Sequence, residues 1–103
     1  MRVAAVLTGK QRRHLRALGH HLEPLVQLGK QGLTPGAERA IDEALEHHEL
    51  VKVKLLKECP EGRDELGERM SPRLAASIAQ AIGRTLLLYR RHPKKPVIVL
   101  PKE

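Results

Sequence analysis

A short loop bracketed by glycines is the first feature of this sequence with a chemical use. The tetrapeptide Gly29-Lys30-Gln31-Gly32 follows an apolar run and precedes Thr34-Pro35, a pair typical of the start of a helix. Glycines permit backbone conformations that other residues avoid, and they let a phosphate group approach the main chain. The first amides and the dipole of the next helix also favour an anion. We therefore expect a phosphate site formed by Gly29, Lys30, Gln31, Gly32 and Thr34.

The basic residues extend this expected site and indicate an anionic partner. The 103 residues include 19 Lys and Arg against 12 Asp and Glu, which gives a formal charge of +7. Residues 9–19 hold four cations and no acidic residue, whereas a helix exposed only for solubility usually mixes signs. We interpret these cations as part of a binding surface, with an ordinary solvated face as the alternative; they are Lys10, Arg12, Arg13 and Arg16. Four further cations could continue this surface if their strands face the same way, namely Lys52, Lys54, Arg84 and Arg90.

Base stacking is not expected to contribute to recognition. The chain has one Tyr and no Phe or Trp, whereas many RNA-binding modules stack bases on aromatic rings. Tyr89 is the single candidate, but a Tyr in a leucine-rich strand usually packs its ring and keeps its hydroxyl at the rim. The composition therefore predicts contacts with phosphates and with RNA shape, of the kind that GXXG loops of KH domains make with backbone nucleotides.

The sequence does not predict an enzyme. Adjacent side chains on a helix diverge by roughly 100°, so His20-His21 and His47-His48 would chelate a metal poorly, and the cysteine pair of the usual zinc patterns is absent. The sequence also contains no nucleophile–base pair and no nucleotide-binding fingerprint. We therefore expect no catalysis, no metal or cofactor, and no small-molecule substrate.

The single cysteine and the short apolar runs predict a cytoplasmic protein. Cys59 can form no internal disulfide and is expected to be an ordinary thiol at a strand end or in a loop. No segment approaches the roughly 18 apolar residues of a membrane span, and the N-terminus lacks a signal-peptide core. We expect a reducing compartment and no membrane contact.

Caps and periodicity predict the elements that position these residues. Thr8 is the expected N-cap of a helix that runs to about Gly19, with an inner arc of Gln11, Leu15, Leu18 and Leu22. A short strand is expected at Leu25–Leu28. A helix from Pro35 to about His48 and an alternating strand from Leu50 to Leu56 should follow.

The second half of the chain is less regular. Arg63 to Met70 favours a helix, whereas Leu74 to Ile82 fits a helix by composition and a strand by alternation. Thr85–Arg90 and Val97–Leu100 read as two strands. We expect them to pair in antiparallel fashion, because the basic, proline-rich connection 91–96 is too short for a crossover.

Four stretches of the chain carry a further signal. They are Leu7–Arg12 with Leu15-Arg16, Gly29–Thr34, Ile41–Leu45 running to His47–Lys54, and Ile82–Arg90. Together they resemble the CRM domain family (chloroplast RNA splicing and ribosome maturation), and specifically its stand-alone bacterial members of the YhbY type. The match covers about residues 7–101, and its most specific tracts are 47–54 and 83–90.

The residues and the resemblance together predict an α/β fold. We expect a single compact domain over residues 1–103, of order α-β-α-β-α-β-β, with a four-stranded mixed sheet packed with helices. The resemblance implies similarity to the C-terminal domain of translation initiation factor three and a strand at residues 78–82. It also implies a continuous third helix, but Gly67 and Ser71-Pro72 interrupt the matching region, so we expect that helix to be short, kinked or split.

The resemblance further implies RNA binding, with the family's GxxG loop matching Gly29 to Gly32. For single-domain bacterial members it implies assembly of the large ribosomal subunit, with rRNA of the large-subunit precursor as partner. The second predicted helix leaves another function open, because it holds five acidic residues and one basic residue: Glu38, Asp42, Glu43, Glu46 and Glu49 against Arg39. Such a face could dock a basic ribosomal protein and make the chain a protein-interaction adaptor, or it could simply be solvated.

Overall fold

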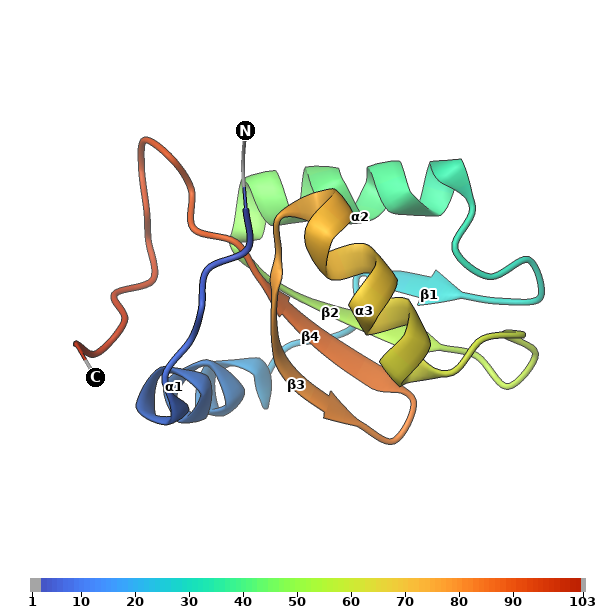
Figure 1. The fold of residues 1–103 in the computed structure, drawn as a ribbon, viewed down its shortest axis with the longest axis horizontal. Coiled ribbons are helices and arrows are strands. Elements are labelled where there is room, and N and C mark those ends of the chain that lie inside the picture. The colour runs from blue at the N-terminus through green and yellow to red at the C-terminus, as the bar shows by residue number, and fades with distance from the viewer. Residues whose placement is uncertain (1–2, 103) are drawn as a thin grey trace.

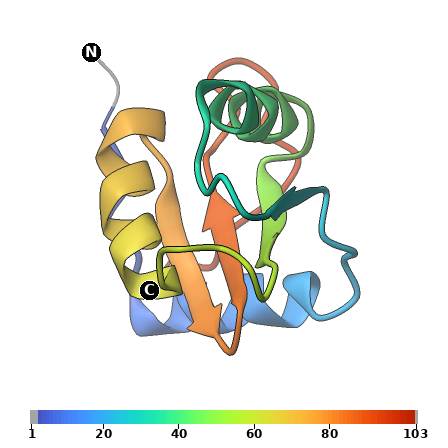
Figure 2. The ribbon, with the colours of Figure 1, turned by 90° about the vertical axis from the view of Figure 1, so that its right-hand side faces the viewer.

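Seven elements build a mixed sheet with helices on both of its faces (Figures 1 and 2). The computed structural model describes residues 3–102. In chain order the elements are α1 (Gly9–Gly19), β1 (Val26–Leu28), α2 (Pro35–His48), β2 (Leu50–Leu55), α3 (Arg63–Leu74), β3 (Ser77–Ile82) and β4 (Thr85–Tyr89). The strands lie in the order β1-β2-β4-β3, with β1 parallel to β2 and the other pairs antiparallel. The predicted α/β order and four-stranded mixed sheet are confirmed.

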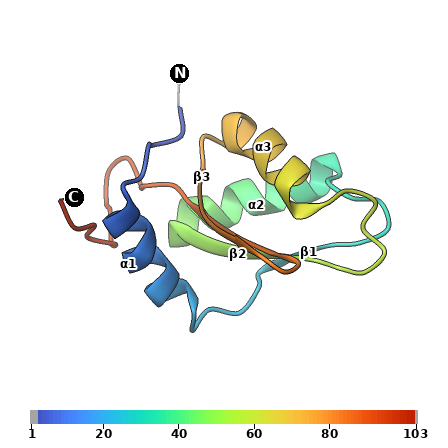
Figure 3. The ribbon, with the colours of Figure 1, turned by 60° about the horizontal axis from the view of Figure 1, so that its bottom comes forward.

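The alternation of β2 divides the interior into two cores. Val51, Val53 and Leu55 belong to the larger core with α2 and α3, whereas Leu50 belongs to the smaller core with α1. The larger core also contains Leu28, Ile41, Leu45, Leu66, Met70, Leu74, Ala76, Leu86 and Leu88. The smaller core consists of Leu7, Leu15, Leu50, Ala79, Leu87 and Tyr89. As Figure 3 shows, α1 lies on the side of the sheet away from α2.

Threonines cap the first two helices, as their positions in the sequence predict. The hydroxyl of Thr8 accepts a hydrogen bond from the N–H of Gln11 at 3.1 Å, and the side chain of Gln11 accepts one from the N–H of Thr8 at 3.0 Å. This reciprocal pair is a capping box. The hydroxyl of Thr34 accepts from the N–H of Ala37 at 3.0 Å, and Pro35 is the first residue of α2.

Helix α1 packs along a narrower line than its sequence suggests. Leu15 and Gly19 are buried, whereas Leu18 and Leu22 are 41% and 38% exposed, so the prediction that they pack inward is wrong. The cause is the close approach of Gly19 to β4, where a Cβ atom would lie 2.6 Å from Cδ2 of Leu87. A helix that rests on the line from Leu15 to Gly19 turns Leu18 toward solvent.

Helix α3 is one helix of 12 residues, so of the predicted alternatives of a short, kinked or split third helix, the split is wrong. Pro72 lies in its last turn, and the helix ends two residues later at Leu74, before Ala75 adopts a φ of 52°. Because proline has no N–H, Pro72 removes one helical hydrogen bond, and α3 accommodates this loss without a break. Ser71 closes the end, because its hydroxyl donates to the carbonyl of Ala76 at 2.6 Å.

The segment that fitted both a helix and a strand contains strand β3, as the resemblance implied. Strand β3 pairs with β4, with an irregularity between Ile78 and Gln80. Ala76, directly before the strand, and Ala79 within it are buried. Pairing with a central strand therefore overrides the helix propensity of this alanine-rich stretch.

The strand predicted at Val97–Leu100 does not form, and that prediction is wrong. Strand β4 is flanked by β2 on one side and by β3 on the other, so it has no free edge for a further strand. Residues 90–102 form neither helix nor strand. Ile98 and Leu100 pack instead against the smaller core.

Candidate nucleic-acid interface

Residues 29–32, the GKQG loop, form a closed turn after β1. The N–H of Gly32 donates to the carbonyl of Gly29 at 2.9 Å, and the N–H of Thr34 donates to the carbonyl of Gly32 at 3.1 Å. Gly32 has a φ of 66°, and a Cβ atom there would lie 3.3 Å from Oε1 of Glu61. The positive φ and the close carboxylate together favour glycine at this position.

Several backbone N–H groups of this region are without an acceptor in the fold. Within residues 3–102, no hydrogen bond is donated by the N–H groups of Lys30, Gln31 and Gly36, among others. The hydroxyl of Thr34 is already engaged as the cap of α2, so Thr34 positions the helix. Because Pro35 has no N–H, Gly36 carries the open amide at the positive end of α2. These amides and the exposed side chain of Lys30 can hold a phosphate.

The GKQG loop lies at the end of the molecule that faces the viewer in Figure 2, and the neighbouring strand ends carry exposed cations. The carbonyl of Arg84 accepts a hydrogen bond from Leu55 at 2.7 Å, which holds the β3–β4 turn at the end of β2. Strand β1 ends beside the same residue, because Leu28 pairs with Leu55. Lys30, Lys54 and Arg84 are all exposed there.

The predicted cations of α1 lie away from this loop. Lys10, Arg12, Arg13 and Arg16 are exposed. Figure 1 shows the N-terminal end of α1 and the GKQG loop toward opposite ends of the long axis, along which the molecule extends 39 Å. Lys52 and Lys54 alternate with the core valines of β2 and face the α1 side of the sheet. The predicted cations thus form one group on α1 and another at the GKQG loop, and the lysines of β2 lie between these groups.

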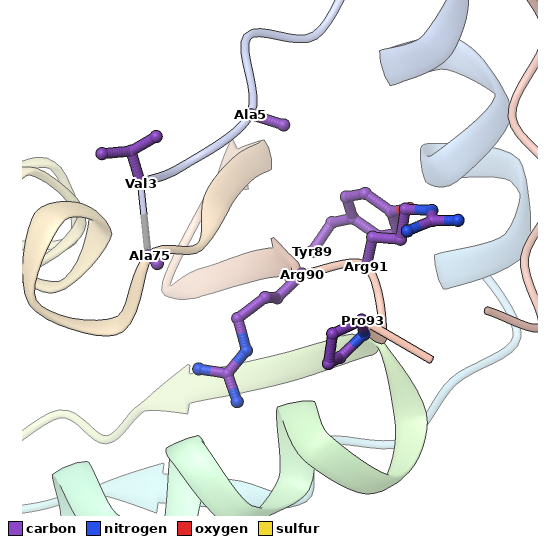
Figure 4. A pocket seen from close by; sticks show the side chains of 7 residues that line it. All are labelled: Val3, Ala5, Ala75, Tyr89, Arg90, Arg91 and Pro93. Atoms are coloured by element: carbon purple, nitrogen blue, oxygen red, sulfur yellow. The ribbon is translucent and has the colours of Figure 1, made fainter. Parts of the chain in front are cut away.

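Arg90 is not a surface cation, and its assignment to the RNA-binding surface is corrected. Its side chain is 8% exposed and donates to Oδ1 of Asp42 at 2.7 Å and to the carbonyl of Leu74 at 2.8 Å. Glu46 places a second carboxylate 3.7 Å away. Figure 4 shows the Arg90 side chain pointing toward α2. In the sequence, the spacing of Asp42 and Glu46 on one helix face was the signal for these partners of the buried guanidinium group.

Tyr89 is part of the smaller core, and its ring packs inward as predicted. The residue is 2% exposed. Burial raises the pKa of its hydroxyl, and the charge of Glu49 raises that pKa further. A pocket of about 210 Å³ lies beside it, lined from the N-terminal segment and from the residues that follow β4 (Figure 4). A buried ring offers no platform for base stacking, and it is the sole aromatic side chain of the Phe, Tyr and Trp class.

Ion pairs divide the cations into two sets. Among residues 3–102, the arginines that pair with carboxylates are Arg63, Arg69, Arg73 and Arg90. Arg69 neutralises Glu61 beside the GKQG loop, with an Nη2–Oε1 distance of 2.9 Å. Within the same residues, no carboxylate lies within 4.0 Å of the cations of α1, the GKQG loop, β2 or the segment after β4, apart from Arg90.

The prediction from the sequence omitted some of the cations that have no carboxylate within 4.0 Å among residues 3–102. The omitted cations follow β4 and are Arg91, Lys94, Lys95 and Lys102, all of them exposed. Their signal in the sequence was the basic, proline-rich composition of residues 91–96.

The acidic residues of α2 are largely engaged within the fold. Three of the five predicted acids pair with Arg73 or Arg90, and Glu49 is 2% exposed. Glu43 and Glu46 are exposed. Part of the acidic face of α2 is therefore engaged within the fold, and part of it faces solvent.

The histidine pairs do not gather further ligands. Across residues 3–102, no three His, Cys, Asp or Glu side chains come together as a metal site. The rings of His20 and His21 stand edge to face with centroids 5.3 Å apart, and those of His47 and His48 are 6.4 Å apart. In the same part of the chain, no helix has the length and apolarity needed to cross a bilayer.

Comparisons with known proteins agree on one family. The CRS1 / YhbY (CRM) domain model matches residues 7–90. "Probable RNA-binding protein YqeI" of Bacillus subtilis is 40% identical over 96 residues, which cover 93% of this chain and 100% of that protein. A Haemophilus influenzae protein named "RNA-binding protein" is 42% identical over 84 residues, 82% of this chain and 85% of the relative. The solution structure of SAV1595 from Staphylococcus aureus matches with a TM-score of 0.79 and 38% identity, over 93% of this chain and 100% of that one. With all seven elements and the GKQG loop inside the matched region, this chain belongs to the CRS1 / YhbY (CRM) domain family.

Proposed function

We propose that this protein binds RNA through the sugar-phosphate backbone, with the GKQG loop and the unpaired cations as its contact surface. The observation that carries this proposal is the division of the cations. Within residues 3–102, arginines of α3 and of the end of β4 are neutralised by carboxylates, whereas the exposed cations of α1, the loop and β2 are not. Such cations can displace the counterions of a polyanion. The names of the relatives support the same class of ligand.

One phosphate is held at the GKQG loop. The N–H groups of Lys30, Gln31 and Gly36 donate to its oxygens, and the ammonium group of Lys30 supplies positive charge. The exposed side chains of Lys54 and Arg84 flank this position and meet neighbouring phosphates. Because phosphate contacts carry no sequence information and Tyr89 is buried, selectivity comes from RNA shape.

We propose rRNA of the large-subunit precursor as the RNA, and assembly of the pre-50S particle in the cytoplasm as the setting. The support is the sequence resemblance to the stand-alone bacterial members of the family. Crosslinking the protein to RNA in cells and sequencing the attached fragments tests this proposal. We expect enrichment on large-subunit rRNA; reads scattered over messenger RNA without that enrichment would overturn the ribosomal part.

A binding titration with deproteinised large-subunit rRNA tests the contact surface. We expect Lys30→Glu combined with Arg13→Glu to weaken binding by about tenfold or more at moderate salt, because both side chains are exposed and no carboxylate of residues 3–102 pairs with them. Arg39→Glu, a charge reversal on the exposed side of α2, is the control and should change affinity far less. Unchanged affinity of the double variant would remove this surface assignment.

A further inference from the structure

The segment 91–102, here called the strap, is fastened near its start although it has no helix or strand. Glu49 lies at the junction of α2 and β2. Its buried carboxylate accepts three hydrogen bonds from the backbone of the strap. The donors are the N–H groups of His92 at 2.7 Å, Val97 at 2.8 Å and Ile98 at 2.8 Å. A single side chain therefore fixes residues 92–98.

The far half of the strap lies against α1. Ile98 and Leu100 pack on the smaller core, while Val97 and Val99 are each 82% exposed. The side-chain amide of Gln11 on α1 donates to the carbonyl of Pro101 at 3.0 Å. Figure 1 shows the end of the strap beside the N-terminal half of α1, whereas the turn of the strap lies farther from that helix, at the same end of the molecule. We call the strap and α1 together the joint surface of this end.

This joint surface carries charge of one sign. Residues 9–19 and 91–102 contain no Asp or Glu, and they hold eight of the 19 Lys and Arg residues: Lys10, Arg12, Arg13, Arg16, Arg91, Lys94, Lys95 and Lys102. All eight are exposed, and within residues 3–102 none has a carboxylate within 4.0 Å. A surface that serves solubility mixes signs, whereas a patch of one sign attracts a polyanion.

The strap lysines are held in place before any ligand arrives. Nδ1 of His92 accepts hydrogen bonds from the N–H groups of Lys94 at 3.1 Å and Lys95 at 2.9 Å, which fixes the turn that carries them. Glu49 anchors the same turn by accepting a hydrogen bond from the N–H of His92. Because a buried carboxylate is costly unless hydrogen bonds satisfy it, this contact favours the observed position of the turn. Cations on a fixed backbone lose less conformational entropy on binding than cations on a mobile tail.

We propose that the strap and α1 form a second surface for the RNA backbone, which engages a segment of RNA other than the one held at the GKQG loop. The two surfaces lie toward opposite ends of a molecule 39 Å long (Figure 1). This inference rests on the proposed RNA-binding function, and it adds residues 91–102 and a second contact region. A protein built in this way holds two parts of a folded RNA in a fixed relation.

Hydroxyl-radical footprinting of deproteinised large-subunit rRNA with the full-length protein tests this proposal. The strap variant is Lys94→Gln with Lys95→Gln, and the loop variant is Lys30→Gln with Arg84→Gln. The control, Arg39→Gln with Arg73→Gln, removes the same charge from the α2 and α3 side. We expect the strap variant to lose protection in one region of the rRNA and the loop variant in another, while the control keeps both. The strap variant should also bind about tenfold more weakly, with a salt slope lower by about one to two.

Other outcomes separate this inference from the function on which it rests. If the strap variant behaves as the control while the loop variant loses protection, RNA binding stands and the second surface is overturned. If both variants lose the same protected region, the protein contacts one RNA segment and the proposal is again overturned. If the wild-type protein protects no rRNA, the proposed function fails and the inference fails with it. Thermal melting of each variant, expected at the wild-type temperature because these side chains are exposed, shows that the fold is intact.

Discussion

The guanidinium group of Arg90 lies 2.7 Å from Oδ1 of Asp42, and this pair ties the end of β4 to the middle of α2. Arg90 also donates to the carbonyl of Leu74, the last residue of α3. One arginine therefore connects the sheet with both helices of the larger core. Its side chain is almost completely buried, so few of its hydrogen bonds can be replaced by water.

Arg90→Met should destabilise the fold by about 2–4 kcal/mol. The substitution removes the Arg90–Asp42 ion pair and leaves the carbonyl of Leu74 without its donor, and leaving a buried acceptor unsatisfied is costly. Urea unfolding followed by circular dichroism measures the change in free energy. The control is Arg73→Met, because Arg73 pairs with Glu38 on the exposed surface and its loss should barely move the midpoint. Equal effects of the two substitutions would contradict the assignment of Arg90 as a structural clamp.

The Glu49 anchor predicts a loss of stability in acid. Burial acts to raise the pKa of Glu49, but hydrogen bonds from the N–H groups of His92, Ile98 and Val97 outweigh it and lower the pKa below its ordinary value of 4.5. Its contribution is therefore complete above that ordinary value and is lost as the pH falls through the lower pKa of the folded state. Melting temperatures measured from about pH 6 to about pH 2 should show this fall.

The matched variant for this titration is Glu49→Gln. An uncharged amide cannot accept three hydrogen bonds as the carboxylate does, so the variant should melt lower at neutral pH. Its curve should approach that of the wild type in acid, where Glu49 is protonated. Parallel curves over the whole range would show that Glu49 does not titrate in this way.

Contact between Gly19 and Leu87 predicts the response of α1 to a single methyl group. A Cβ atom at Gly19 would lie 2.6 Å and 2.8 Å from the two Cδ atoms of Leu87, which is buried in the smaller core. Gly19→Ala should therefore cost about 1–3 kcal/mol of unfolding free energy, since overpacking displaces the helix or the leucine. Gly9→Ala, in the same helix but with its nearest atom 3.6 Å away, should be neutral within about 0.5 kcal/mol. A neutral Gly19→Ala would mean that α1 can move off the sheet at no cost.

Local signals in the sequence predict the elements well. The caps at Thr8 and Thr34 depend on residues within three positions, and both form as predicted. The alternation of β2 likewise predicts which of its residues enter the larger core. These features need no knowledge of distant parts of the chain.

The failures come from contacts between distant segments. Val97–Leu100 has the composition of a strand, but the order of strands leaves β4 without a free edge. Leu18 fits the inner arc of a helix, but the approach of Gly19 to Leu87 sets the rotation of α1. Arg90 looks like a surface cation until α2 places Asp42 beside it. For the candidate site, the sequence predicted the GKQG loop, but it did not show that the cations of α1 lie toward the other end.

Gly32 and Gly83 both have a positive φ, but only Gly32 has close neighbours. Substituting each by alanine therefore distinguishes the cost of backbone strain from the cost of steric crowding. Gly32 in the GKQG loop has a φ of 66° and Gly83 in the β3–β4 turn has a φ of 57°, but a Cβ atom at Gly83 would meet nothing within 4 Å. Gly83→Ala should therefore cost about 1 kcal/mol, the backbone part alone. Gly32→Ala should cost more, because its methyl group also meets Glu61 at 3.3 Å. It should also weaken rRNA binding, since the loop must shift. Chemical denaturation measures the stability loss, and a binding titration measures the change in rRNA affinity. If both variants lose equal stability and keep the wild-type affinity, the loop geometry does not matter for binding.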